Sequence, residues 1–387
     1  MQIIMAAMPI GIYWAAGSIG HGHLAISVGT LVAYTGLQQG LFGPTVSLLG
    51  VGITLQSSLA LFERVFEYLD LPVEMPQLRR RSHPKRLDVA RSVEVRATVR
   101  LAGASTMRLN TTEGMSMYVE AADGTRLAYE DYGRGEPIVF VASAMLDADM
   151  WEYQIPWFVE RGYRCIAFDR RGHGRSDRPS SGYDFDTLSD DLAAVIDHLD
   201  LRDITLVGHS TGGAEVAHYM ARHGEERVAR AVLVSAMLPY LMQADDNPAG
   251  IPEESIEGLI AAIRTDRPKW LAGQAQSFFA TQRNPHVSPA MVDWMLALCL
   301  RPAPWVVPRI QRLALVTDHR SALSAITVPI LVVHGALDFS APIDLTGRRT
   351  AQRIAGAVLK EYPSAGHALI ASHHEQFNTD VLEFIKG

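Results

Sequence analysis

The chain has 387 residues, and at about 100–200 residues per domain it has room for one large enzyme domain and a smaller unit. Its formal net charge is −7, and acidic and basic residues are interspersed through the second half, so it offers no extended basic surface for a nucleic acid. The two cysteines, Cys165 and Cys299, lie far apart and without the spacing of metal ligands, so the sequence indicates neither a disulfide framework nor a zinc site.

The N-terminal part is poor in charge, because the first charged side chain (Asp, Glu, Lys or Arg) is that of Glu63. Two apolar runs, residues 3–16 and 24–53, flank a polar, glycine-rich stretch at residues 17–23. A membrane-spanning helix needs about 20 apolar residues. We therefore predict two α-helical transmembrane segments within residues 1–71, of which the first is short.

Clusters of arginine and lysine follow this region at residues 79–81 and 85–86, and such clusters mark the cytoplasmic side of a membrane. We therefore expect the second half of the chain to lie in the cytoplasm, attached to the membrane. A secretory signal peptide would need a positively charged start, which residues 1–4 lack. A soluble helical hairpin is the alternative, since residues 38–40 and Pro44 interrupt the longer apolar run.

Three segments resemble the last membrane helix of an ABC exporter and its cytoplasmic extension, namely residues 29–34 (GTLVAY), 41–44 (LFGP) and 58–70 (SLALFERVFEYLD). A complete exporter would continue into an ATP-binding domain, yet the chain has no Gly-x-x-x-x-Gly-Lys-Ser/Thr loop to bind phosphate. The resemblance, over about residues 9–74, therefore implies a truncated permease. A membrane transport component with an appended enzyme domain is the alternative function.

Residues 72–114 are basic and show no clear period, which predicts a linker. Our hypothesis is a gene fusion or a mis-set start upstream of a self-sufficient enzyme. With a mis-set start, that enzyme would be cytoplasmic.

From residue 115 onward, short apolar runs alternate with segments of helical spacing, after a strand hairpin that turns at Asp123-Gly124. Strands are predicted at residues 116–120, 126–131, 137–142, 164–168, 204–207, 231–234, 330–333 and 358–362. Strands that alternate with helices form a parallel sheet with both faces covered. We therefore predict a doubly wound, mostly parallel α/β domain over residues 115–387. The alternation stops at about residues 238–324, where we predict a helical cap.

A Gly-x-Ser-x-Gly motif directly follows the predicted strand 204–207 and precedes a predicted helix at residues 213–222. The motif consists of Gly208, His209, Ser210, Thr211 and Gly212. Such a serine sits on a sharp strand-to-helix turn, where a side chain at either flanking glycine would collide with the backbone. The strand-motif-helix context predicts a nucleophile elbow with Ser210 as the nucleophile of an α/β hydrolase.

An activated serine needs a base and an orienting acid, which in this fold follow in the order acid, then histidine, each after a strand. Asp338 follows the predicted strand 330–333 and His367 follows the strand 358–362. We therefore predict the catalytic triad Ser210, Asp338 and His367. Asp318 is the rival acid, although its neighbours His319 and Arg320 favour a local ion pair.

Residues 146–154 (LDADMWEYQ), 167–177 (AFDRRGHGRSD) and 207–210 (VGHS) resemble the bacterial esterases also classed as cofactor-free (non-heme) haloperoxidases. This resemblance covers nearly all of residues 115–387. It implies hydrolysis of small carboxylic esters through an acyl-enzyme, with no metal and no other cofactor. It also implies a perhydrolase side activity, in which hydrogen peroxide replaces water and the resulting peracid oxidises halide.

The resembled family usually has His-Gly after its third strand, whereas Ala142-Ser143 stand here. The oxyanion hole of this fold uses two backbone amides, which we assign by position to Thr211 and Ala144. Because glycine is the most permissive residue for φ, the serine is expected to disturb the loop. Restoring the pair with Ala142→His and Ser143→Gly is therefore expected to raise kcat for short esters more than it lowers KM.

Other features give weaker hypotheses. The pairs His21/His23 and His373/His374 lack a converging third ligand, so no metal site is predicted. A hydrolase-fold protein that binds a ligand without turnover is a further alternative, supported by the altered loop. A homo-oligomer is compatible with the sequence.

Five aromatic residues lie in the predicted cap, and each is as well explained by a place in the pocket wall as by one in the core of the cap. They are Trp270, Phe278, Phe279, Trp294 and Trp305.

Overall fold

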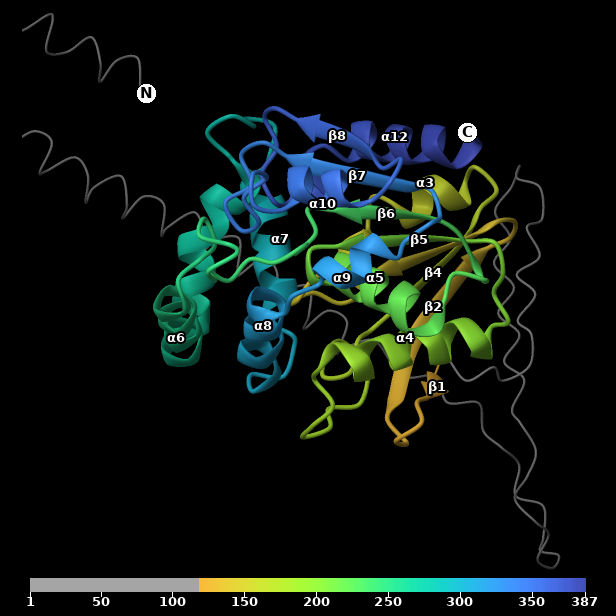
Figure 1. Cartoon of the computed structure of the whole chain (residues 1–387), viewed down its shortest axis with the longest axis horizontal. Coiled ribbons are helices and arrows are strands. Elements are labelled where there is room, and N and C mark those ends of the chain that lie inside the picture. Colours follow the sequence, from red (N-terminus) through yellow and green to blue (C-terminus); the bar gives the residue numbers. More distant parts are fainter. Residues whose placement is uncertain (1–117) are drawn as a thin grey trace, which may run out of the picture. The chain divides into compact units, whose positions relative to one another are not determined.

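A computed structural model describes residues 118–387, in which a single eight-stranded sheet carries helices on both faces (Figure 1). The strands are β1 (Tyr118–Glu120), β2 (Arg126–Gly133), β3 (Pro137–Val141), β4 (Arg164–Phe168), β5 (Ile204–His209), β6 (Val228–Val234), β7 (Ile330–Gly335) and β8 (Val358–Tyr362). They lie in the order β1-β2-β4-β3-β5-β6-β7-β8. β1 pairs antiparallel with β2, and β2 antiparallel with β4, whereas the remaining neighbours pair in parallel. The predicted mostly parallel sheet is therefore confirmed.

The central strands are apolar on both sides because each side of the sheet is covered. Ile138 and Phe140 of β3 pack into one core cluster, and Val139 and Val141 pack into the other. Such alternation follows from the period of two along a strand. It explains why these strands appear in the sequence as continuous apolar runs.

Different helices cover the two faces. One core cluster includes residues of α3 (Ile155–Val159) and α12 (His374–Lys386), together with the cap. The other includes residues of α4 (Phe185–His198), α5 (Thr211–His223) and α9 (Arg320–Ser324). The remaining short helices are η1 (Ala148–Trp151), α10 (Gly347–Arg353) and α11 (Leu369–Ser372).

Three helices form the cap between β6 and β7, namely α6 (Glu253–Phe279), α7 (Pro289–Cys299) and α8 (Val306–Val316). Figure 1 shows them grouped at one end of the sheet. The predicted cap, residues 238–324, also included α9, but α9 packs against α5 and α10. The last part of that range therefore belongs with the helices that cover the sheet.

Helix α6 is kinked, and its sequence explains the kink. Asp266 has φ −155° and ψ 82°, outside the helical region. Pro268, two residues later, cannot continue the helix because it lacks an amide hydrogen and its ring clashes with the preceding turn. The Asp266 carboxylate accepts from the amide of Lys269 at 3.0 Å, so it caps the second half of α6.

The predicted membrane segments and exporter-like region in residues 1–71, and the linker at residues 72–114, lie outside the described residues. So do the first two residues of the strand predicted at 116–120. None of the helices between Tyr118 and Gly387 is long and apolar enough to cross a membrane.

Candidate active site

Ser210 stands on the predicted sharp turn between β5 and α5. Its φ of 57° and ψ of −118° place it in a region that non-glycine residues rarely adopt. A Cβ atom on Gly208 would lie 2.4 Å from the carbonyl oxygen of Gly212, and one on Gly212 would lie 2.3 Å from that of Val141. Neither position therefore has room for a side chain. The turn leaves the Ser210 side chain facing a pocket above the sheet.

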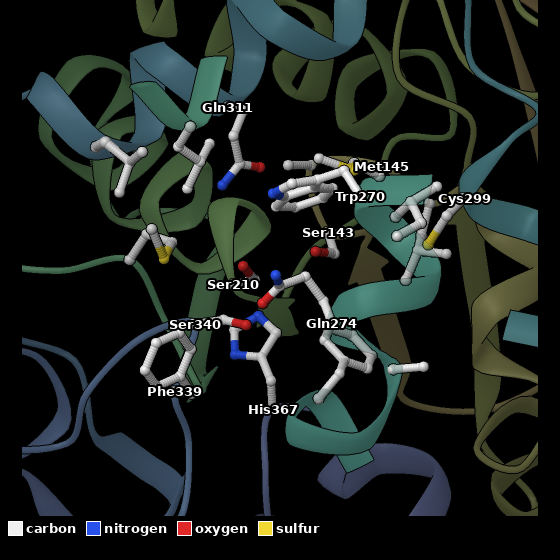
Figure 2. A pocket seen from close by; sticks show the side chains of 18 of the residues that line it. Ser143, Met145, Ser210, Trp270, Gln274, Cys299, Gln311, Phe339, Ser340 and His367 are labelled. Atoms are coloured by element: carbon white, nitrogen blue, oxygen red, sulfur yellow. The ribbon is translucent and has the colours of Figure 1, made fainter. Parts of the chain in front are cut away.

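Asp338 and His367 meet at the carboxyl ends of neighbouring strands. Asp338 lies in the loop after β7, His367 in the loop after β8, and His367 Nδ1 is 2.7 Å from Asp338 Oδ2. Both residues are at least nine-tenths buried. Figure 2 shows the His367 ring directed towards Ser210, with which it shares the pocket. Asp318 instead pairs with Arg320, at 2.6 Å, as its neighbours suggested.

The Asp338 carboxylate is held in its ionised form. Burial alone would raise its pKa, but the charge and hydrogen bond of His367, the nearby His334 and the amide of Ala341 together hold that pKa below its usual value. The Ala341 amide donates to Oδ1 at 2.8 Å. An ionised, anchored carboxylate can fix the His367 ring with Nδ1–H towards it, which leaves Nε2 free to accept a proton.

His209 was predicted as part of the motif, and its side chain supports the histidine loop. Its Nε2 donates to the backbone carbonyl of His367 at 2.9 Å. Burial lowers the pKa of His209 to about 3, so the ring is neutral. A neutral ring has one N–H, and the carbonyl can only accept, so this contact determines the tautomer of His209.

Two backbone amides are available beside Ser210. Thr211 is the first residue of α5, so its amide has no partner within the helix. Ala144 lies in the loop after β3, and its amide makes no hydrogen bond to any residue within 118–387. Both amides belong to the residues that the sequence assigned to the oxyanion hole.

The loop that carries Ala144 is held by buried polar side chains. Arg170 donates to the carbonyls of Ala142 and Ser143 at 2.6 and 2.9 Å, and to the Glu215 carboxylate at 2.5 Å. His173 Nε2 lies 2.8 Å from the carbonyl of Ala144. Arg170 thus anchors the carbonyls of Ala142 and Ser143, and a neutral His173 anchors that of Ala144 when its one N–H is on Nε2.

Sequence reasoning assigned no role to these three anchors, Arg170, His173 and Glu215. All are at most 2% exposed, and burial of charged residues is uncommon unless they are paired. Burial raises the pKa of Glu215 to about 7, and burial with the nearby Arg170 charge lowers that of His173 to about 4. The signal available in the sequence was the AFDRRGHGRSD segment, which contains both Arg170 and His173.

The pocket in front of Ser210 has a volume of about 390 Å³ and mostly apolar walls. Of the five cap aromatics, Trp270, Phe278 and Phe279 line it, whereas Trp294 packs edge-on against Tyr153 and Trp305 is 47% exposed. The polar side chains that line the pocket are Ser143, Ser210, Ser255, Gln274, Gln311, Ser340 and His367. Among these lining residues there is no lysine, arginine, aspartate or glutamate.

The histidine pairs considered as metal ligands are placed elsewhere. His373 contacts the hydroxyls of Ser364 and Ser372, and His374 stacks on Tyr153. The pair His21/His23 lies outside the described residues. In the part of the chain from Tyr118 onward, no group of three or more His, Cys, Asp or Glu could hold a metal ion.

Comparison with known proteins agrees with this geometry. Residues 136–373 match the family model of the alpha/beta hydrolase fold. The chain is 41% identical over 268 residues to the non-heme chloroperoxidase CPO-A1 of Kitasatospora aureofaciens, which covers 68% of this chain and 97% of that protein. It is 35% identical over 275 residues to the bifunctional esterase/perhydrolase DCH of Acinetobacter calcoaceticus, covering 70% of this chain and 99% of that protein.

The esterase EaEST of Exiguobacterium antarcticum is similar in structure, with a TM-score of 0.67 and 32% identity over 70% of this chain and all of that one. The matched family model spans more than half of the chain, and each of these relatives is covered almost completely. The chain therefore belongs to the α/β-hydrolase family, as a hydrolase of the type that includes esterases and non-heme haloperoxidases.

Proposed function

We propose that this enzyme hydrolyses small, uncharged carboxylic esters through an acyl-enzyme on Ser210, with perhydrolysis as a side activity. The observation that carries the proposal is the 2.7 Å contact between His367 Nδ1 and Asp338 Oδ2, made beside a pocket that also holds Ser210. The absence of charged side chains among the pocket-lining residues supports an uncharged substrate, because a charge placed against apolar walls without a partner is costly.

The acylation step assigns a role to each side chain. His367 Nε2 takes the Ser210 proton as Oγ attacks the ester carbonyl, and Asp338 stabilises the imidazolium that forms. The amides of Ala144 and Thr211 donate to the developing oxyanion. The tetrahedral intermediate then expels the alcohol, which receives its proton from His367, and leaves the acyl group on Ser210.

Deacylation distinguishes hydrolysis from perhydrolysis. Water, deprotonated by His367, attacks the acyl carbon and releases the carboxylic acid together with free Ser210. If hydrogen peroxide attacks instead, the product is a peracid. The peracid then oxidises a halide ion to hypohalous acid and is itself reduced to the carboxylic acid, so this chemistry needs no metal centre.

The test is Ser210→Ala, assayed with a panel of p-nitrophenyl esters of graded acyl length. We expect a loss of several orders of magnitude in kcat at unchanged Tm, because a triad without its serine retains only about 10³–10⁴-fold catalysis over water. A variant that kept a tenth of wild-type turnover would refute the assignment. Labelling by a fluorophosphonate probe separates this function from ligand binding without turnover, since the probe reacts with an activated serine.

We further propose that residues 1–71 attach the enzyme to a membrane. The support is that no Asp, Glu, Lys or Arg precedes Glu63 and that two apolar runs lie before it. Fractionation should find the full chain with membranes, and a full chain recovered wholly in the supernatant would refute attachment. The exporter resemblance supports no transport activity, because the chain lacks a phosphate-binding loop.

A further inference from the structure

Ser143 presents a hydroxyl group to the pocket that holds Ser210. Its side chain lines that pocket and is 7% exposed. Figure 2 shows its oxygen in the same part of the pocket as that of Ser210. Within the described residues the Ser143 hydroxyl makes no hydrogen bond. A ligand in the pocket can therefore accept a hydrogen bond from this hydroxyl.

The backbone of Ser143 is already engaged by other groups of the protein. Its amide lies 3.3 Å from the sulfur of Met150, and its carbonyl accepts from Arg170 at 2.9 Å. The carbonyl also accepts from the amide of Leu146 at 3.4 Å. These contacts fix where the Cβ atom points, while the hydroxyl hydrogen can still rotate towards an acceptor.

The backbone conformation of Ser143 does not explain why a serine stands at this position. Its φ is not positive, so this backbone would accept alanine as readily as serine. The neighbouring Ala144 carries the amide assigned to the oxyanion hole. The Ser143 hydroxyl is thus one residue away from a predicted oxyanion donor and faces the same cavity.

We propose that the Ser143 hydroxyl is a third donor to the oxyanion, beside the amides of Ala144 and Thr211. This inference rests on the acyl-enzyme chemistry proposed above. When Ser210 Oγ bonds to the ester carbonyl carbon, the π electrons of the carbonyl group move onto the carbonyl oxygen. That oxygen then carries a full negative charge and three lone pairs. The Ser143 hydroxyl donates a hydrogen bond to one of these lone pairs, and its proton stays on the serine oxygen.

The experiment compares Ser143→Ala with wild type in kcat, KM and Tm for one short ester. A hydrogen bond to a charged group is worth about 1.5–3 kcal/mol, so we expect kcat to fall about 10- to 100-fold. KM and Tm should change little, because the donor acts on the transition state and the loop remains anchored by Arg170. Ser143→Thr, which retains a hydroxyl, should recover part of the loss.

A second readout excludes a merely structural role. A phenylboronic acid forms a tetrahedral adduct with the nucleophile, so its inhibition constant should rise in Ser143→Ala in step with the loss of kcat/KM. The matched control is Ser235→Ala. Ser235 is also buried with an unpartnered hydroxyl, but it does not line the pocket, so its loss should leave kcat unchanged.

Two results would overturn the inference. One is a kcat for Ser143→Ala within twofold of wild type, and the other is an effect confined to KM, which would make Ser143 a substrate-binding group. Ser210→Ala is assayed in parallel. If Ser210→Ala is inactive while Ser143→Ala is fully active, the third donor is wrong and the proposed function stands. If Ser210→Ala is active, the proposed function itself fails.

Discussion

The choice between two carboxylates shows how residue-level geometry decides a role. Asp338 and Asp318 both precede His367 in the chain, and both follow the nucleophile motif. Asp338 is buried and in contact with His367, whereas Asp318 is occupied by Arg320, whose charge and hydrogen bond lower the pKa of Asp318. An aspartate held by a surface arginine cannot also orient a buried imidazole.

We therefore expect Asp338→Asn to lower kcat by about 10⁴, the effect known when the orienting acid is lost and the histidine adopts the wrong tautomer. Asp318→Asn should change kcat by less than about twofold, since its contacts are local. Steady-state kinetics on the two variants, with Tm as the control for folding, measures both. If Asp318→Asn were the more harmful change, the acid would have been misassigned.

The sequence expectation for the oxyanion loop rested on a premise that the structure does not support. Serine at position 143 was expected to disturb a backbone that needs glycine, but the φ of Ser143 is not positive. The loop carbonyls are held by Arg170 and His173 whatever side chain stands at position 143. Restoring glycine would thus remove a hydroxyl and relieve no strain, so the third-donor inference expects kcat to fall where the earlier argument expected a rise.

Among the elements, the loop after β3 depends on a buried ion pair. Glu215 of α5 is fully buried, and burial raises its pKa to about 7 although Arg170 opposes the shift. An acid whose folded pKa lies above its unfolded value favours the fold in its protonated form. Its contribution is fully present below about pH 4.5, and it is lost as the pH rises through about 7.

The raised pKa of Glu215 predicts a pH-dependent difference in stability between wild type and Glu215→Gln. The two proteins should be similarly stable near pH 4, where Glu215 is largely protonated in both the folded and the unfolded state. Towards pH 8 wild type should lose stability relative to the variant, by at most about 3 kcal/mol at 1.36 kcal/mol per pKa unit. Urea unfolding at the two pH values measures the slope. A wild type that gained stability relative to Glu215→Gln at pH 8 would show a pKa below the unfolded value.

The cap shows what single-sequence reasoning could not supply. Helical stretches between β6 and β7 were predicted, because the strand pattern stops there. Both halves of α6 reach the pocket, with Ser255, Ile256 and Leu259 before the kink at Asp266, and Trp270, Gln274 and Phe278 after it. The spacing of Trp270, Gln274 and Phe278 indicates a common helix face, but no local pattern tells which neighbour that face meets.

At the scale of the whole molecule, the sheet was the most predictable part. The buried strands β5 and β7 are continuous apolar runs, and Ser210 and Asp338 could be assigned because each follows one of them. His367 follows β8, whose sequence VLKEY is an edge strand with charged residues. The anchors Arg170, His173 and Glu215 could not be assigned in this way. Charged and polar side chains are usually exposed, and their burial here follows from partners that lie 27 to 45 residues away along the chain.

The described residues also suggest that the enzyme is self-sufficient. All of them belong to one compact unit with its own core on both sides of the sheet. We expect residues 115–387, expressed alone, to fold with the Tm and kcat/KM of the hydrolase in the full chain. Failure of this shorter chain to fold, or a tenfold loss of kcat/KM, would show that the preceding residues support the enzyme.

One contact between cap and catalytic loop limits how this enzyme could be recombined with its relatives. The amide of Ala368 donates to the carbonyl of Phe278 at 2.9 Å, so the residue after His367 is tied to the last turn of α6. A Cβ atom on Gly366 would lie 2.6 Å from the same carbonyl. A chimera that takes cap residues from a relative should therefore return to this protein's own sequence at the Asp266 kink. The half of α6 before the kink is then an exchangeable cassette, whereas the half after it has to be inherited together with the histidine loop.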